Sequence, residues 1–404
     1  MSYMVIRFPL FNIKGYGKRL PLLILSLKLV FGLFSWGIYQ FYYGGNNVDI
    51  INYWKDSELL YLVSKLNFSH FIELFLWNSN REIPDHLWPY LKDTLYCMNM
   101  SDFSIIRMQT LIRFFSGGNI ITHVLIFAFL SYTGLFFIFK TFENKIIYSK
   151  ALIYAVFLIP SVLFWSSGMH KESIALLGFG LAIYFFRKNE LNLKNIFFIF
   201  IGIIILYFIR KVMLLWLLGF FLFWGIETLC KEKKPIFKLV LSSVVIVFFF
   251  LIFHFNDVSK QLKEKRIDFI ENTFGRYELD KLSIHETNSY IAFFKESIYH
   301  AFCFPAIWEP MISIKYFFAI ENLVLIFIVI FLLYQIKRKN FFIDIEVKYL
   351  FISGLLIFFL IGFVVNNEIA IMRYKAQFYP VILAALLFSI KREPAISDNG
   401  KQVI

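Results

Sequence analysis

Five short runs of polar and ionisable residues stand out in a chain that is dominated by apolar side chains. In the first run, Asp49 and Tyr53 are four residues apart and therefore share one face of a helix, and Trp54 follows them. A carboxylate placed in this way could act as a general base that removes a proton from a hydroxyl group. The alternative is an ordinary loop aspartate beside an aromatic membrane anchor.

Two further runs bring positive charge to short turns between apolar stretches. Three consecutive ionisable residues close the first of these runs, and two adjacent cations form the second. Contact with a phosphate or a sugar would explain such groups, and so would snorkelling to the membrane interface or contact with lipid headgroups. The residues are His170, Lys171, Glu172, Arg210 and Lys211.

The last two runs lie at the beginnings of apolar stretches near the C-terminus. A carboxylate inside such a stretch is rare unless it is paired or lines a wet cavity. An arginine there needs a carboxylate or a phosphate as its partner, and an amide four residues later shares its helix face. The residues are Glu309 and Glu321 in the fourth run, and Asn367, Arg373 and Gln377 in the fifth.

The elements that position these residues must be membrane helices. Hydrophobic residues make up 59% of the 404 residues and charged residues 17%, whereas soluble domains have about 45–50% and about 25%. We therefore expect an all-α, polytopic membrane protein with about ten spans of roughly 17–25 residues. The predicted spans are 20–43, 119–141, 147–166, 172–187, 195–210, 212–229, 237–255, 316–336, 346–366 and 369–390.

The net charge of +13 follows the predicted topology. With both termini in the cytoplasm, the cytoplasmic segments hold 21 Lys+Arg and 8 Asp+Glu, and all other residues hold 20 of each. This agrees with the positive-inside rule and argues against a nucleic-acid patch. The segments are 1–19, 140–150, 187–194, 227–238, 337–348 and 391–404.

The same topology predicts one transmembrane domain, residues 20–390, between a cytoplasmic N-terminal tail (1–19) and a cytoplasmic C-terminal tail (391–404). It places two long loops, about 44–118 and 256–315, outside the membrane. Both loops contain amphipathic runs, 68–77 and 289–302, that could lie on the membrane surface. All five polar runs then fall at outer helix ends, as in a site that faces the outer leaflet.

Several kinds of chemistry have no motif in this chain. We find no phosphate-binding GxxxxGK[ST] loop and no HExxH, GxSxG or CxxC, and the seven histidines lack metal-ligand spacing. We predict no cofactor, although a divalent cation remains possible. A carboxylate and several cations at an outer membrane surface fit glycosyl transfer from a polyprenyl-phosphate- or diphosphate-linked sugar. Cations would stabilise the leaving phosphate, and an acid would deprotonate the acceptor.

The chain also resembles the GT-C superfamily of integral-membrane glycosyltransferases, whose long first outer loop carries a catalytic carboxylate soon after the first helix. Many members have an acidic pair there, whereas Ile50 follows Asp49 in this chain. Other motifs are similar to bacterial membrane proteins of polysaccharide loci, including repeat-unit polymerases. The motif similar to the GT-C superfamily is DIINYW (49–54). The motifs similar to the proteins of polysaccharide loci are PSVLFWSSGMHKES (160–173), FPAIWEP (304–310) and NEIAIMRYKAQFYP (367–380).

The resemblance implies a role for each run in a bacterial cytoplasmic (inner) membrane protein of polysaccharide assembly. Asp49 would be the base, cations would surround the lipid phosphate, and acids would orient a sugar or a cation. The cations are Lys171, Arg210 and Arg373, and the acids are Glu172, Glu309 and Glu321. The expected partners are a polyprenyl-phosphate-linked saccharide, membrane lipid and other assembly proteins. A repeat-unit polymerase, a flippase for a lipid-linked glycan and a structural membrane partner remain alternatives.

Overall fold

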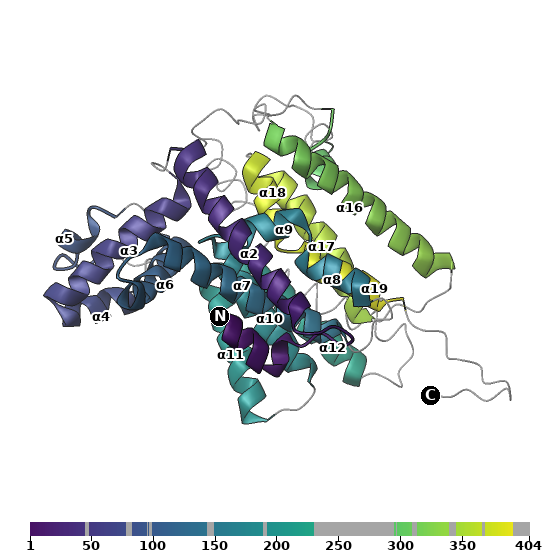
Figure 1. Ribbon diagram of the computed structural model, residues 1–404, viewed down its shortest axis with the longest axis horizontal. Helices are drawn as coiled ribbons and strands as arrows, with labels where there is room; N and C mark the ends of the chain where they lie inside the picture. The colour runs from purple at the N-terminus through teal and green to yellow at the C-terminus, as the bar shows by residue number, and fades with distance from the viewer. Residues whose placement is uncertain are drawn as a thin grey trace. The chain divides into compact units, whose positions relative to one another are not determined.

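The residues that the computed structural model describes form helices (Figure 1). The structure contains no β-strand in the residues that it describes, so the all-α prediction is confirmed for them. The structure describes residues 1–44, 48–77, 83–94, 96, 99–143, 149–188, 192–229, 295, 297–308, 313–338, 345–365 and 368–390.

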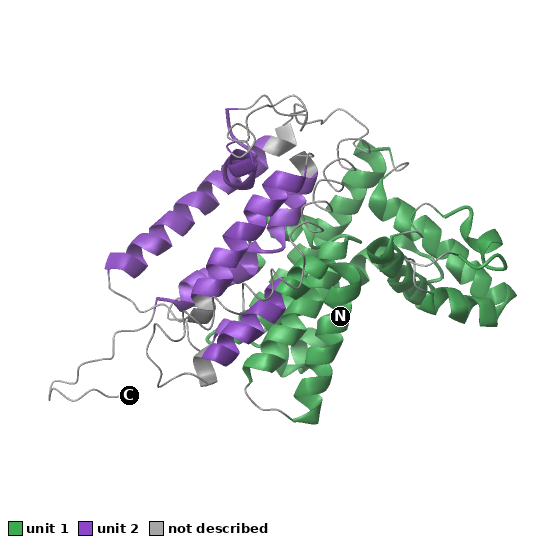
Figure 2. Ribbon diagram, turned by 180° about the vertical axis from the view of Figure 1, so that it is seen from behind, with its two compact units in different colours: residues 1–141, 157–215 green, residues 142–156, 216–404 purple. Residues whose placement is uncertain are grey.

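The chain divides into two compact units, which Figure 2 shows in two colours. Unit 1 comprises residues 1–141 and 157–215, and unit 2 comprises residues 142–156 and 216–404. The helices of unit 1 are α1 (Ser2–Arg7), η1 (Pro9–Phe11), α2 (Arg19–Gly37), η2 (Ile38–Tyr42), α3 (Asp49–Leu66), α4 (Phe68–Leu76), α5 (Trp88–Leu91), α6 (Met100–Ser116), most of α7 (Ile120–Glu143), α9 (Pro160–Trp165), α10 (Lys171–Arg187) and α11 (Leu193–Ile209). Unit 2 holds most of α8 (Ser149–Phe157) and α12 (Lys211–Leu229), with η3 (Tyr299–Cys303), α16 (Ser313–Arg338), α17 (Ile345–Val364), α18 (Glu368–Ala376) and α19 (Tyr379–Phe388).

Three helical stretches of the described chain are long and apolar enough to cross a bilayer. They are Arg19–Tyr42, Ile120–Glu143 and Tyr316–Arg338, and they coincide with three predicted spans. Three shorter apolar helices, Leu193–Ile209, Lys211–Ile226 and Lys348–Val364, overlap three more. The structure therefore indicates a membrane protein, while the count of ten spans and their orientation stay predictions.

Two of the predicted spans are broken rather than continuous. The span 147–166 is divided into α8 and α9, because Pro160 begins α9 and forces Ile159 into an extended conformation (φ −67°, ψ 122°). The span 369–390 is divided into α18 and α19 close to Pro380, which lacks the N–H that a continuous helix requires. The predicted span 237–255, most of the loop 256–315 and the C-terminal tail lie outside the described residues.

Close helix packing fixes the position of α10 inside unit 1. A Cβ atom at Gly202 of α11 would lie 2.5 Å from the carbonyl oxygen of Gly178 of α10, so only glycine allows the two backbones to approach this closely. The α10 helix is almost wholly buried, and even its polar first turn is covered. The N-terminus of α10 therefore holds the polar side chains of its first turn in fixed positions.

The predicted loop 44–118 is largely helical. The α3 helix packs against both α4 and α6. The amphipathic run 68–77 coincides with α4, whose Phe71 and Leu74 are buried. This segment therefore forms a helical substructure that carries Asp49 at its first helical residue and Asp102 in the first turn of α6.

Candidate functional site

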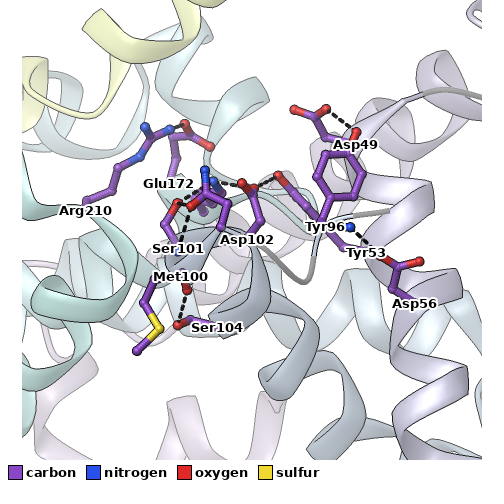
Figure 3. Close-up of polar contacts among 12 residues, drawn as sticks. Asp49, Tyr53, Asp56, Tyr96, Met100, Ser101, Asp102, Ser104, Glu172 and Arg210 are labelled. Atoms are coloured by element: carbon purple, nitrogen blue, oxygen red, sulfur yellow. Dashed lines mark hydrogen bonds and ion pairs between the residues drawn. The ribbon is translucent and has the colours of Figure 1, made fainter. Parts of the chain in front are cut away.

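The first polar contact of unit 1 joins the start of α10 to the start of α6 (Figure 3). Lys171 Nζ lies 2.5 Å from Asp102 Oδ1 and donates a hydrogen bond of 2.8 Å to Ser101 Oγ. The two charged side chains are about nine-tenths buried. A buried ammonium and a buried carboxylate each require the other, because an unpaired charge in this position has a large desolvation cost.

The next residue of α10 forms a second ion pair with a different partner. Glu172 is fully buried, and its Oε1 accepts from the NH2 group of Arg210, the residue between α11 and α12. Adjacent residues on α10 thus bind a carboxylate from α6 and a guanidinium from the α11–α12 turn. The second and third polar runs of the sequence therefore meet, with Glu172 as the connecting carboxylate.

Two tyrosines extend the cluster to α3. The Tyr53 hydroxyl donates to Asp102 Oδ1, and the ring of Tyr53 packs edge-to-face on Tyr96 at a centroid distance of 5.0 Å. Tyr96 donates from its hydroxyl to Asp49 Oδ1 at 3.2 Å and from its backbone N–H to Asp56 Oδ2 at 3.2 Å. A series of contacts therefore runs from Asp49 through Tyr96, Tyr53 and Asp102 to Lys171, and Figure 3 labels the first four of these residues.

Acidic groups outnumber basic groups in this cluster, which joins four carboxylates and two cations (Figure 3). Burial and the Asp49 carboxylate raise the pKa of Tyr96 to about 12. Tyr96 is consequently neutral near pH 7 and able to donate its proton in the hydrogen bond to Asp49. The carboxylates are Asp49, Asp56, Asp102 and Glu172, and the cations are Lys171 and Arg210.

Sequence reasoning missed Asp102, the residue that connects the first polar run, at Tyr53, to the second, at Lys171. A local signal was present, because Asn99 accepts a hydrogen bond from Ser101 N as the N-cap of α6 and Asp102 follows in the first turn. That pattern predicts a helix start with a favourably placed acid. It contains no information that Lys171 is its partner. Asp56, Tyr96 and Ser101 were missed for the same reason.

The other residues predicted in these runs lie differently. His170 is fully buried, and its Nε2 lies 3.2 Å from Ser35 Oγ, with its ring edge-to-face on Tyr39 of η2. His170 therefore ties the turn before α10 to α2 and η2. Lys211 is exposed and stands over the ring of Tyr207, with Nζ 5.7 Å from its centroid.

Unit 2 contains a separate polar centre around α18. Arg373 and Gln377 are both buried, and Gln377 Nε2 donates to the Tyr374 carbonyl at 3.1 Å. The sequence analysis did not select Lys375, whose buried Nζ donates to the Phe304 carbonyl at 3.0 Å and lies 3.4 Å from Asn322 Oδ1.

The structure describes one of the two predicted acids of the fourth run and does not describe the amide Asn367 of the fifth run. Glu321 is half-buried on α16 in unit 2, next to Asn322. Glu309 and Asn367 lie outside the described residues. Asn322 donates from Nδ2 to the carbonyls of Phe302 and Cys303 at 3.2 and 3.0 Å, so it connects α16 to the end of η3.

No group of three or more histidine, cysteine or acidic side chains with metal-binding geometry occurs within the described part of the chain. The cluster in unit 1 instead offers one half-exposed carboxylate and two cations that are each neutralised by a carboxylate. Such a set can accept a proton at Asp49 and bind an anion at Lys171 or Arg210 if the carboxylate partner is displaced.

Comparison with protein-family models, with curated proteins and with solved structures finds no match to this chain.

Proposed function

We propose that this protein is an integral-membrane glycosyltransferase of bacterial cell-surface polysaccharide assembly. It would use a polyprenyl-phosphate- or diphosphate-linked sugar at the outer leaflet of the cytoplasmic membrane. The observation that supports this proposal best is the continuous series of contacts from Asp49 through Tyr96, Tyr53 and Asp102 to Lys171. It brings a half-exposed carboxylate and a lysine ammonium into one cluster, and these are the two kinds of group that the proposed reaction needs.

In the proposed reaction, Asp49 is the general base. Its carboxylate is half-exposed, so an acceptor hydroxyl can reach it, and Tyr96 orients it through the bond to Oδ1. Asp49 takes the proton of the acceptor hydroxyl, and the acceptor oxygen forms a bond to the anomeric carbon of the donor sugar. The bond from that carbon to the phosphate oxygen breaks, and the phosphate leaves with the electron pair.

The leaving phosphate needs positive charge and no proton. Lys171 and Arg210 come from the start of α10 and from the turn between α11 and α12, where the cluster gathers. Phosphate oxygens would compete with Asp102 and Glu172 for these cations, and charge-assisted bonds to phosphate are strong enough for that exchange. Arg373 of unit 2 is buried, and its assignment as a phosphate-binding cation rests on the resemblance to the GT-C superfamily.

The proposal is tested by complementation in the source bacterium. A strain that lacks the gene receives the wild-type chain, Asp49→Asn, Arg373→Ala or, as a control, Lys194→Ala, whose side chain is exposed on α11. Surface polysaccharide is quantified, and membrane abundance is measured by immunoblot. We expect both site variants to lose at least about 100-fold of the product, the usual size of a general-base or charge-stabilising contribution. The control should retain production.

The lipid-linked material that accumulates identifies the reaction. An acceptor that lacks one sugar indicates the proposed transferase, and complete repeat units on the outer leaflet indicate a repeat-unit polymerase. Repeat units confined to the inner leaflet would indicate a flippase and contradict the proposal. Normal polysaccharide in both site variants, at normal membrane abundance, would reject the assigned site.

A further inference from the structure

The helices between the candidate spans Arg19–Tyr42 and Ile120–Glu143 expose large apolar side chains. On α4, Phe68 and Ile72 are one helical turn apart and both exposed. On α6, Leu111, Phe114 and Phe115 occupy one face, and Phe115 has 90% of its surface exposed. Side chains of this kind are depleted from surfaces that face only water unless they mark an interaction site.

Ring contacts connect two of these side chains, Phe68 and Phe114, across α3, α4 and α6. The ring of Phe114 lies 5.1 Å from that of Tyr61 on α3 and 5.9 Å from that of Phe71 on α4. Phe71 in turn lies 5.8 Å from Phe68. We call this set of side chains the apolar face. It consists of Tyr61, Phe68, Ile72, Leu111, Phe114 and Phe115.

The apolar face is held next to the start of a membrane span. The α6 helix ends at Ser116, and α7 begins at Ile120 after a turn in which Gly117 and Gly118 have φ values of 59° and 85°. Trp54 Nε1 donates to the Gly118 carbonyl at 3.1 Å, and the Arg113 guanidinium stacks on the Trp54 ring at 4.6 Å. These contacts fix the direction of α6 relative to α7.

The other end of the segment is also attached to a span. Six residues separate Tyr42, the last residue of η2, from Asp49, the first of α3. Seven chain steps of at most about 3.6 Å limit this distance to about 25 Å. Both ends of the α3–α6 substructure are thus restrained close to the membrane surface at which α2–η2 ends and α7 begins.

We propose that the apolar face rests in the lipid bilayer at the boundary between headgroups and acyl chains. The occupant is the phospholipid in which the chain's own spans are embedded, because Phe114 and Phe115 lie in the last turn of α6 and the candidate span α7 begins at Ile120. Lys65 stands over the Tyr61 ring, with Nζ 5.2 Å from the centroid, where an ammonium can contact headgroup phosphates. The C-terminal half of α3 would then lie on the membrane, which holds Asp49 at a fixed depth.

Spin-label accessibility in liposomes tests this inference without any assumption about enzymatic activity. The full chain, with Cys97, Cys230 and Cys303 replaced by serine, receives a nitroxide at Phe68→Cys, Leu111→Cys or Phe115→Cys. Controls carry it at Ser69→Cys or Glu73→Cys, exposed polar positions one residue further along α4 from Phe68 and Ile72 and therefore about 100° round the helix. Collisions with oxygen, which enters lipid, and with a water-soluble nickel chelate are measured in vesicles of phosphatidylethanolamine and phosphatidylglycerol.

We expect the three labels on the apolar face to collide several-fold more with oxygen than with nickel, and the two controls to show the reverse order. Nickel-accessible labels at Phe68 and Phe115 would overturn the inference. Labels reached by neither reagent would also overturn it, because they would indicate a second copy or a protein partner on the face. A variant that does not elute as a single species is replaced by Phe115→Trp. The additional fluorescence of this tryptophan should be quenched in vesicles whose lipids are brominated near the headgroup, and it should not be quenched in vesicles without brominated lipid.

Discussion

The ammonium group of Lys171 lies 2.5 Å from the carboxylate of Asp102, although the two residues are far apart in the sequence. The contact joins the first turns of α6 and α10, and Tyr53 of α3 shares the same carboxylate oxygen. Three helices of unit 1 therefore meet at one oxygen atom. Because both charges are largely buried, the pair contributes to the stability of this meeting point as well as to its charge.

The first prediction concerns this ion pair. We expect Asp102→Asn and Lys171→Met each to lower the free energy of unfolding by about 3 kcal/mol, because each leaves the opposite charge buried without its counter-ion. The double variant should lose less free energy of unfolding than the sum of the two single losses, by at least about 1 kcal/mol. Denaturant unfolding in detergent micelles measures all three values.

The matched control for the pair is Lys211→Met, which removes an exposed ammonium and should change the stability by less than about 0.5 kcal/mol. Strictly additive effects of Asp102→Asn and Lys171→Met would show that the two side chains do not interact in the folded protein.

The second prediction concerns the pH dependence of stability through Tyr96. Its pKa is about 12 in the folded protein, raised from 10.0 by burial and by Asp49. Above about pH 10 the folded state therefore binds more protons than the unfolded state, so the free energy of unfolding falls as the pH rises from about 10 toward 12. Tyr96→Phe should remove this part of the decline, as measured by unfolding midpoints across that range.

Asp49→Asn provides the comparison for Tyr96. Because the Asp49 carboxylate contributes to the raised pKa, its removal should bring the folded-state pKa of Tyr96 closer to 10.0 and make the decline smaller. A decline of the same size in wild type, Tyr96→Phe and Asp49→Asn would assign the pH dependence to other groups.

The sequence predicted the helices more reliably than their partners. Composition and hydropathy identified a helical membrane protein, because apolar runs of span length are rare in soluble domains. The breaks at Ile159 and near Pro380 were missed, since an apolar run reads as continuous even where a proline interrupts the backbone hydrogen bonds. Hydropathy indicates whether a segment lies in lipid or in water, and it contains little information on where the helix bends.

For the candidate site, the sequence predicted several of the residues but not the pairs that they form. Residue type and position selected Lys171, Glu172 and Arg210, because ionisable groups between apolar stretches are unusual. The pairing of Glu172 with Arg210 and of Lys171 with Asp102 depends on the tertiary arrangement of α6, α10 and α11. Asp102 lies in a polar segment, where an acid is ordinary, and the helix-start pattern around it does not indicate Lys171 as its partner.

The third prediction concerns the glycine turn before α7. Gly117 and Gly118 both have positive φ, but only Gly118 is crowded, since a Cβ there would lie 2.5 Å from the Arg113 NH1 atom. We expect Gly117→Ala to cost about 1–2 kcal/mol, the usual penalty of a left-handed conformation for a residue with a side chain. Gly118→Ala should cost clearly more, because it also displaces Arg113 from the Trp54 carbonyl. Equal unfolding midpoints for the two variants would contradict this argument.

The fourth prediction concerns Lys28, a fully buried lysine in the middle of the candidate span Arg19–Tyr42. Within the described residues its ammonium donates one hydrogen bond, to Ser166 Oγ at 2.6 Å. A buried cation whose partner is a neutral hydroxyl is costly, because the hydroxyl offsets only part of its desolvation. Lys28→Met retains most of the side-chain volume and removes the charge. We therefore expect the thermal unfolding midpoint of this variant to equal or exceed that of the wild type.

Ser166→Ala should have the opposite effect, because it leaves the Lys28 ammonium without its hydrogen-bond acceptor. The double variant Lys28→Met/Ser166→Ala should regain most of the loss, since no buried cation remains to be satisfied. Lys28→Ala separates volume from charge: it should be less stable than Lys28→Met by about 2–5 kcal/mol, the usual cost of a cavity left by a large side chain. If Lys28→Met were instead as unstable as Lys28→Ala, the ammonium itself would be a stabilising element of the contact between α2 and the end of α9.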